Sequence, residues 1–259
     1  MKNDGKDVAR KQFSQNAADY RNESVFAEGI DLKEMVSSVP LTGSERLLDI
    51  GCGAGHTALA FAPYVTQVVG CDLTPAMVEM ARDLAHERQI GNVEFVVSDA
   101  EHLPFADSSF ERVTCRFAAH HFPDIKAALR EVSRVLKPGG TFLLVDHYAP
   151  EDPELDTFVN DLDRVRDPSH VREHRLSEYQ TFFSEADLTF QLKLTWDLPL
   201  MFDNWVTRSR TPSEAKEWLV NHLKNASPKA RDAFCVQQDE RGYPQSFCLK
   251  CALIHGITD

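Results

Sequence analysis

Apolar residues along the chain form five short continuous runs, each followed by a turn and usually by a helical pattern. The runs cover residues 46–50, 67–72, 93–98, 111–116 and 141–146. Continuous apolar runs are typical of strands that are covered on both faces, whereas strands with one exposed face alternate. Strands that alternate with helices through short loops predict a doubly wound, mostly parallel sheet.

Two of the intervening helices have clear start and stop signals. Thr74 is placed to cap a helix whose first position is Pro75, and Asp124 is placed to cap the helix before the fifth run. Apolar residues in both segments recur at the spacing of one helix face. The segment 137–140, Lys-Pro-Gly-Gly, ends the second helix and returns the chain to the next strand.

The pattern changes after residue 150. Residues 151–185 are charged and helical in character, and the segments 189–196 and 246–255 predict two further strands. The second of these partly alternates, which favours an antiparallel pair at one edge of the sheet. About fifty residues lie between the two strands, and a loop of that length needs structure of its own.

The expected architecture is an α/β, Rossmann-like, doubly wound sheet of seven mostly parallel strands with an antiparallel edge strand. We expect an N-terminal helical lid at 1–45 and a cofactor-binding core at 46–150. Residues 151–259 would complete the sheet, with a helical insert at about 198–240 that caps the substrate.

The charge and composition of the chain indicate which kinds of partner are disfavoured. The 259 residues include 28 Lys and Arg against 40 Asp and Glu, for a net charge of −12. This balance disfavours nucleic acids and anionic membranes as partners. No apolar run reaches the length of a membrane span, and the polar N-terminus does not resemble a signal peptide. Six scattered cysteines favour reduced thiols, so we expect a cytoplasmic protein; the sequence does not predict its oligomeric state.

The most informative segment is the glycine-rich turn after the first strand. Gly51, Gly53 and Gly55 follow Asp49 at the point where the strand gives way to a helix. Ligands of open α/β sheets bind at the carboxyl ends of the strands, and glycines let a ligand approach the backbone closely. The helix that follows offers free N–H groups to an anion.

Asp72, at the end of the second strand, is placed to accept hydrogen bonds from both hydroxyls of a ribose, which indicates a nucleoside-containing cofactor. The structural alternative is that Asp72 caps the helix at Thr74. A dinucleotide fingerprint, G-x-G-x-x-G, would require glycine where His56 stands. An NAD-dependent oxidoreductase is therefore the less favoured class.

Four segments resemble the class I S-adenosylmethionine-dependent methyltransferases, in the same order. They are LLDIGCGAG, GCDLTPAMVEMAR, SDAEHLPFADSSFERV and LREVSRVLKPGGTFLLVD. Within that family, residues 46–146 are most similar to the branch of ubiquinone/menaquinone-biosynthesis methyltransferases, which contain a methyltransferase type 11 domain. The resemblance implies methyl transfer from S-adenosylmethionine to a small aromatic or hydrophobic molecule, with C- or O-methylation favoured.

The resemblance also implies roles for individual cofactor-binding residues. The glycine turn, including Gly51, Gly53 and Gly55, would lie against the methionine part of the cofactor, with Asp49 close by. Asp72 would hold the ribose hydroxyls, and Leu73 would pack on the adenine.

Four further residues match the family at the rim of this site. Asp99 would accept from the adenine amino group, and the N–H of Ala100 would meet a ring nitrogen. Arg116 would offer its backbone carbonyl to the methionine amino group, and Tyr20 resembles the lid tyrosine. Without the resemblance, Asp99 could equally be a turn residue.

His120 and His121 follow the fourth strand, beside the expected position of the methyl group. One of them could orient or deprotonate the acceptor, because histidine titrates near neutral pH. The alternative is a histidine that hydrogen-bonds a loop carbonyl. A protein that binds the cofactor without catalysis is the remaining class of function.

Substrate contacts are expected from later segments. The basic run at 164–175 includes Arg166 and His170, and it could form a cationic rim for an anionic substrate or a helix face of salt bridges. His147, after the fifth strand, and Trp205, in the insert, are candidates for the same pocket. Cys248 and Cys251 have the spacing of half a metal site, but no second pair follows and strand alternation puts them on opposite faces, so we expect no metal.

Overall fold

A computed structural model describes residues 3–22, 27 and 29–258. The strands are β1 (Arg46–Ile50), β2 (Gln67–Asp72), β3 (Val93–Val97), β4 (Phe110–Arg116), β5 (Leu136–His147), β6 (Gln191–Met201), β7 (Gln237–Gln238) and β8 (Pro244–Ile257). The longer helices are α1 (Asn3–Asn22), α3 (Ile30–Ser37), α5 (Pro75–Glu87), α6 (Ile125–Val135), α7 (Pro153–Arg166), α8 (Leu176–Glu185) and α10 (Ser213–Lys224). The shorter ones are α4 (His56–Phe61), α9 (Phe202–Arg208), α11 (Pro228–Ala233) and the 3₁₀ turns η1 (Ala62–Tyr64) and η2 (Ala119–His121).

The strands form one sheet in the order β3-β2-β1-β4-β5-β8-β6, which confirms the predicted fold class. β1 to β5 are parallel, and β8 is antiparallel to both β5 and β6. The order reverses at β1, where β2 lies on one side and β4 on the other, so ligands are expected beyond the carboxyl ends of these strands. The two-residue strand β7 pairs with β8 and is too short to leave a sequence pattern.

Helices cover both faces of the parallel strands, which explains their continuous apolar runs. On one face, α6 and α8 bury side chains such as Leu129 and Phe183 against the sheet. On the other, α3, α4 and α5 bury side chains such as Met35, Phe61 and Val78. The expected cap by Asp124 is present, since its carboxylate accepts from the N–H of Ala127.

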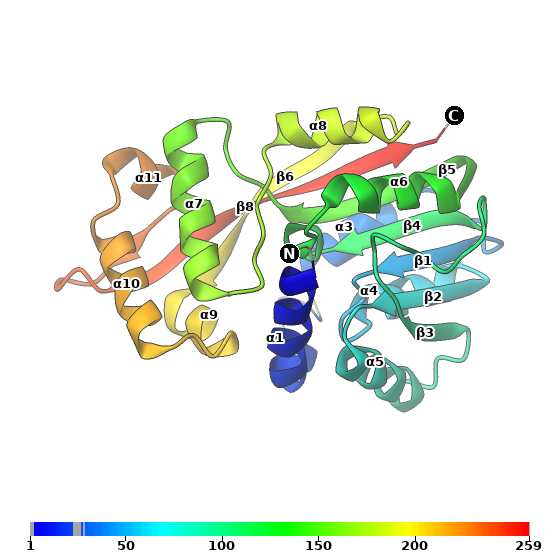
Figure 1. Ribbon diagram of the computed structural model, residues 1–259, viewed down its shortest axis with the longest axis horizontal. Helices are drawn as coiled ribbons and strands as arrows, with labels where there is room; N and C mark the ends of the chain where they lie inside the picture. Colours follow the sequence, from blue (N-terminus) through cyan, green and yellow to red (C-terminus); the bar gives the residue numbers. More distant parts are fainter. Residues whose placement is uncertain (1–2, 23–26, 28, 259) are drawn as a thin grey trace.

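β6 and β8 extend beyond the parallel strands and join a second group of helices. Figure 1 shows β8, in red, running along the molecule toward α7, α9, α10 and α11. These helices share a third core with the ends of the two strands, including Leu200, Trp205 and Phe247. Figure 1 also shows α1 between this group and the helices that cover the sheet.

Two element boundaries differ from the predicted ones by several residues. β6 continues to Met201 because it pairs with β8 over its length, although most of its residues are exposed and give no apolar run. β5 begins at Leu136, because the Lys-Pro-Gly-Gly segment remains in the sheet through an irregularity opposite Phe110. Among the described helices, none is long and apolar enough to cross a membrane.

Candidate active site

The glycine turn between β1 and α4 has the backbone that its sequence predicts. Gly51, Gly53 and Gly55 have φ values of +65°, +50° and +89°, which residues with side chains rarely adopt. A Cβ on Gly51 would lie 2.5 Å from the Cβ of Ala118, whereas a Cβ on Gly53 would meet nothing within 4 Å. The turn is therefore closely packed at Gly51 and open at Gly53.

Asp49 lies behind this turn rather than in front of it. Its carboxylate accepts a hydrogen bond of 3.1 Å from the N–H of Ala58 and one of 2.8 Å from Oγ1 of Thr114. Burial raises the pKa of Asp49 to about 7, although both hydrogen bonds and the nearby Arg116 oppose the shift. Asp49 thus fixes the start of α4 and holds a buried, titratable charge under the glycine turn.

Asp72 connects the ends of β1 and β2. Its Oδ2 accepts from the N–H of Gly53 at 3.0 Å, and its Oδ1 accepts from the N–H of Thr74 at 2.8 Å. Burial raises the pKa of Asp72 above its usual value despite these bonds. The bond to Thr74, the residue before α5, fixes the chain at the start of that helix, although it caps none of the helix's own N–H groups. The side chain also faces a pocket, so the two roles are compatible.

A pocket, which we call the glycine-turn pocket, lies at the carboxyl edge of β1, β2 and β4. Most of the expected cofactor residues line it: Gly51, Gly53, Asp72, Leu73, Asp99, Ala100 and Arg116. Gly55 and Asp49 do not line it. Gly55 packs against Ala81 and Phe95, and Asp49 bonds the N–H of Ala58. From α1, Lys6, Ala9 and Phe13 close another side. The side chain of Tyr20 lies outside the described residues.

An ion-pair contact joins α1 to the rim of this pocket. Nζ of Lys6 lies 2.6 Å from Oδ2 of Asp99 and 2.6 Å from Oε2 of Glu101. Asp99 also accepts from the N–H of Glu101, as a turn residue would. Burial alone would raise the pKa of Asp99, but Lys6 outweighs it and the pKa is lowered. Lys6 was missed by the sequence analysis, because a lysine in a polar N-terminal segment gives no signal.

The side chain of Arg116 has a structural contact. Its Nε donates a 2.5 Å hydrogen bond to Oδ2 of Asp31, and both residues are buried. The guanidinium carbon lies 5.0 Å from the ring centroid of Phe117. This ion pair fixes α3 to the end of β4, beside the backbone carbonyl to which the resemblance assigns a role.

A second pocket adjoins the first, and we call it the histidine pocket. Its lining residues come from α1, the ends of β4 and β5, α7, and the β6–α9–β8 region: Phe13, Phe117, His120, His121, His147, Arg166, Leu198, Leu200, Trp205, Arg208 and Leu249. Phe13, Phe117 and His121 also line the glycine-turn pocket. Five of the expected catalytic and substrate residues therefore come together, while His170 lies behind them, with its ring centroid 5.7 Å from that of His120.

His120 forms a buried pair with Asp146. Its Nδ1 lies 2.6 Å from Oδ1 of Asp146, whose Oδ2 accepts from the N–H of His120 at 3.0 Å. Burial alone would lower the pKa of His120, but the charge and hydrogen bond of Asp146 outweigh it and raise the pKa. Asp146 holds the ring by its Nδ1 side, which leaves Nε2 as the atom that can accept a proton.

His121 has the contact that the structural alternative expects. Its Nδ1 lies 3.1 Å from the carbonyl oxygen of Ser169, to which a neutral ring donates its proton. Burial and the charge of His120 lower the pKa of His121 to about 4. The ring of Phe13 packs edge-on against the His121 ring, with the two ring centroids 4.9 Å apart. His121 is thus a neutral group in the wall between the two pockets.

Phe117 occupies an unusual backbone position between the pockets. Its φ is +52°, in the left-handed region that bulky residues rarely enter. Its ring centroid lies 5.0 Å from that of His147. Strained backbone of this kind is concentrated at functional sites, and the sequence contains no sign of it.

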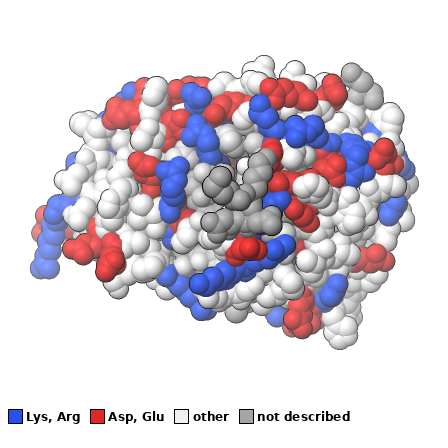
Figure 2. Space-filling view, in the orientation of Figure 1, with Lys and Arg blue, Asp and Glu red and all other residues white. Residues whose placement is uncertain are grey.

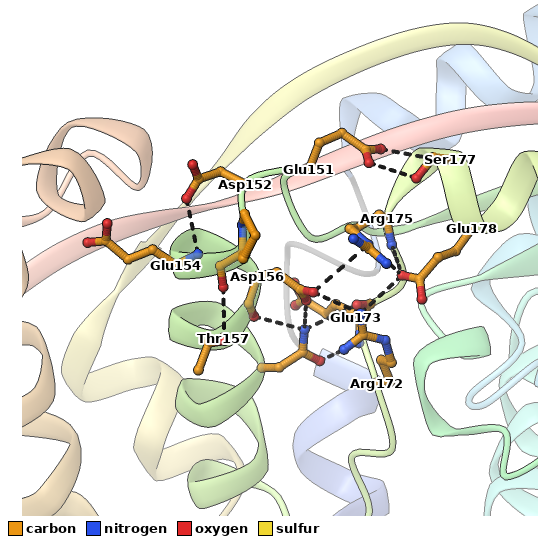
Figure 3. A network of polar contacts seen from close by, with 12 residues as sticks. Glu151, Asp152, Glu154, Asp156, Thr157, Arg172, Glu173, Arg175, Ser177 and Glu178 are labelled. Carbon is orange, nitrogen blue, oxygen red and sulfur yellow. Dashed lines mark hydrogen bonds and ion pairs between the residues drawn. The ribbon is translucent and has the colours of Figure 1, made fainter.

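The basic run at 164–175 does not form an unpaired cationic rim. Arg172 bonds Asp156 at 2.9 Å and Glu178 at 3.0 Å, and Arg175 bonds Glu178 at 3.1 Å (Figure 3). Arg166 is buried, with its guanidinium carbon 4.9 Å from the Trp205 ring centroid and its Nε bonded to the Trp205 carbonyl. Figure 2 shows acidic and basic side chains interspersed over the viewed face. Of this run, only Arg166 lines the histidine pocket.

Comparison with known proteins shows the family to which this fold and its two adjoining pockets belong. Residues 48–144 match the family described as a methyltransferase domain. Over 245 residues the chain is 54% identical to the uncharacterized methyltransferase YcgJ of Bacillus subtilis (strain 168), an alignment that covers 95% of this chain and 97% of YcgJ. The chain therefore belongs to the methyltransferase family.

The similarity to YcgJ extends to structure. The crystal structure of YcgJ superimposes with a TM-score of 0.86 at 53% identity, covering 88% of this chain and 97% of that chain. Two relatives with more specific names match part of the chain. A 27-O-demethylrifamycin SV methyltransferase of Amycolatopsis mediterranei is 36% identical over 60% of this chain and 57% of its own length. The ubiquinone/menaquinone biosynthesis C-methyltransferase UbiE of Pseudomonas putida is 41% identical over 40% and 43%.

Proposed function

We propose that this protein transfers a methyl group from S-adenosylmethionine, bound in the glycine-turn pocket, to a small acceptor bound in the histidine pocket. The observation that supports this most directly is the shared wall of the two pockets. Phe13, Phe117 and His121 line both, so molecules bound in the two pockets would meet there. Displacement at a methyl group needs such an end-to-end alignment of donor and acceptor.

The residues present fit the cofactor. The open side of Gly53 leaves room for a ligand against the backbone. Asp72, at the end of β2, faces the same pocket and has a carboxylate that can accept from ribose hydroxyls. Leu73, Asp99 and Ala100 lie along the side where the resemblance puts the adenine.

S-adenosylmethionine, when bound, supplies a methyl group that is already activated on a sulfonium. The protein then has to orient the acceptor, exclude water and receive a proton. Phe13 from α1 and Phe117 from the end of β4 exclude water from the junction. His121, neutral and fixed by Ser169, adds a polar contact at the same place.

We assign the proton-accepting role to His120. The Asp146 carboxylate holds Nδ1, and Nε2 takes the proton from a hydroxyl of the acceptor, either the methylated oxygen or a hydroxyl that activates an adjacent ring carbon. This arrangement accommodates both the C- and the O-methylation that the names of the partial relatives describe for those proteins. The rings of Trp205 and Phe117 and the side chains of Leu198 and Leu200 favour an aromatic or hydrophobic acceptor.

The test is methyl transfer from labelled S-adenosylmethionine to a panel of phenols, hydroxyquinones and hydrophobic alcohols. We expect labelled product from at least one class of hydroxylated aromatic acceptor. The variant His120→Ala should lower kcat about 10²- to 10⁴-fold, which is the usual contribution of a positioned base. A protein that binds the cofactor but transfers no methyl group to any acceptor would be a binding protein. Equal kcat in the variant would remove His120 from the mechanism.

A further inference from the structure

Behind the histidine pocket, two carboxyl groups face each other in the interior. Asp163 comes from α7, and Glu173 comes from the loop between α7 and α8; both are buried, and the Glu173 side chain has no exposed surface. Among the described residues, no hydrogen-bond donor meets Oδ1 of Asp163 or either carboxylate oxygen of Glu173. Nδ1 of His147, which also lacks a partner there, lies 3.6 Å from Oε1 of Glu173.

This group differs from two other clusters of potential metal ligands in the described part of the chain. The first combines His147 with His120 and Asp146, but the latter two are already bonded to each other. The second lies at the rim of the glycine-turn pocket, where the Asp99 and Glu101 carboxylates are already ion-paired with Lys6. Only in the third cluster do all the members have buried atoms without partners.

Buried polar atoms without partners are rare in folded proteins, because each costs its full desolvation energy. Two adjacent carboxylates are costlier still, since their charges repel. The pair must therefore hold either a shared proton or a cation.

The surrounding structure holds Glu173 in this position. The N–H of Glu173 donates to Oδ1 of Asn160 at 2.8 Å, and Nδ2 of Asn160 donates back to the Glu173 carbonyl at 3.2 Å. Next in the chain, Arg172 is ion-paired with Asp156 and Glu178 (Figure 3). Ligands that are fixed in place by surrounding hydrogen bonds are characteristic of metal sites.

We propose that His147, Asp163 and Glu173 bind a divalent transition-metal ion, with Zn²⁺ as the first candidate and Mn²⁺ as the second. One atom from each side chain lies within 4.8 Å of the others, and the 3.6 Å separation between Nδ1 of His147 and Oε1 of Glu173 suits two ligands of one ion. One imidazole and two carboxylates are a ligand set that both metals accept. Two negative charges would balance the ion.

This inference goes beyond the proposed function and does not depend on it. The ring of His147 lines the histidine pocket, so the ion would lie behind the wall of the acceptor site, away from the glycine turn. The sequence gives no sign of this metal site, because His147, Asp163 and Glu173 are far apart in the chain and only the fold brings them together.

The experiment measures metal content and needs no methyl transfer. Tag-free protein is stripped with EDTA, dialysed against ZnCl₂ and then against metal-free buffer, and its bound zinc is measured by mass spectrometry. A parallel sample receives Co²⁺, whose visible absorption reports nitrogen and oxygen ligands in a low-symmetry site. Each sample is compared with Glu173→Gln and with Asp161→Asn, which removes an exposed carboxylate from α7, the helix that carries Asp163.

We expect one equivalent of zinc and a visible cobalt spectrum for the unmodified protein and for Asp161→Asn, and neither for Glu173→Gln. Zinc should raise the Tm of the first two proteins and leave that of Glu173→Gln unchanged. The glutamine variant should fold, because its amide can donate to Asp163 as a shared proton would. If the unmodified protein binds neither Zn²⁺ nor Co²⁺, or if Glu173→Gln binds them equally well, the carboxyl pair holds a proton and the proposal is wrong.

Discussion

The ammonium group of Lys6 lies 2.6 Å from the carboxylate of Asp99, so the N-terminal helix α1 is ion-paired to the loop that follows β3. The same ammonium reaches Glu101, and Gln12 further along α1 donates to the carbonyl of Ser209 after α9. Helix α1 thus spans the glycine-turn pocket and touches the C-terminal helices.

Replacement of Lys6 should loosen this closure. Lys6→Ala removes both ion pairs at the rim, and we expect S-adenosylhomocysteine to dissociate about five- to tenfold faster, equivalent to roughly 1 kcal/mol for a partly buried ion pair. Stopped-flow displacement measures the rate. Lys11→Ala, which removes an exposed lysine of the same helix, is the control and should leave the rate unchanged. Equal rates for both variants would mean that α1 does not close the pocket through Lys6.

Gly51 should tolerate no side chain. In Gly51→Ala the new Cβ would lie 2.5 Å from Ala118 and the residue would keep a positive φ, so backbone or neighbour must shift. We expect the free energy of unfolding to fall by about 2–3 kcal/mol in urea titrations. Gly91→Ala is the matched control, because a Cβ there meets nothing within 4 Å and φ is not positive. Similar stability of the two variants would show that the turn is not constrained as described.

The charge of Asp49 should make stability depend on pH. Its folded-state pKa of about 7 lies above the value near 4 of an unfolded aspartate, so the native state holds an extra proton between those values. Stability due to this group is then complete below about pH 4 and is lost as pH rises toward 7, by up to about 1.4 kcal/mol per pH unit. Above pH 7 the contribution of Asp49 to stability no longer changes with pH.

Asp49→Asn isolates that contribution. The free energy of unfolding of the variant, minus that of the unmodified protein, should increase from pH 5 to pH 7 and then level off. Urea denaturation at half-unit intervals of pH measures the difference. A difference that does not change with pH would mean that Asp49 is ionised at its ordinary pKa in the folded protein.

Much of the fold and of the first pocket could be predicted from the sequence, because both depend on local patterns. Continuous apolar runs predict buried parallel strands, and the glycine turn followed by Asp72 marks the switch in strand order. Leu73, Asp99 and Ala100 line the same pocket, because they lie just past the ends of β2 and β3. Their contacts with a cofactor remain predictions.

The rest depends on contacts between distant segments. Asp146 lies one residue before the end of β5, which pairs with β4, and His120 lies in the turn after β4, so parallel pairing of the two strands brings them to the same edge of the sheet. The contacts of Lys6 and Phe13 could not be predicted, because an amphipathic N-terminal helix does not indicate which surface it covers. For the arginines at 172 and 175, the sequence left both a cationic rim and a face of salt bridges open. It does not show that Asp156 and Glu178 fold against them, which favours the salt bridges.

The central claim is that the glycine-turn pocket binds S-adenosylmethionine through Asp72, and calorimetric titration tests it most directly. S-adenosylmethionine, S-adenosylhomocysteine and NADH are titrated into the unmodified protein, Asp72→Ala, and Glu79→Ala as a control that removes an exposed carboxylate from α5. We predict that both adenosyl compounds bind and NADH does not. Asp72→Ala should weaken binding by about 1.5–3 kcal/mol for each hydrogen bond lost to the ribose, and Glu79→Ala should not. Binding of NADH alone, or equal affinity of Asp72→Ala and the unmodified protein for the adenosyl compounds, would contradict the account.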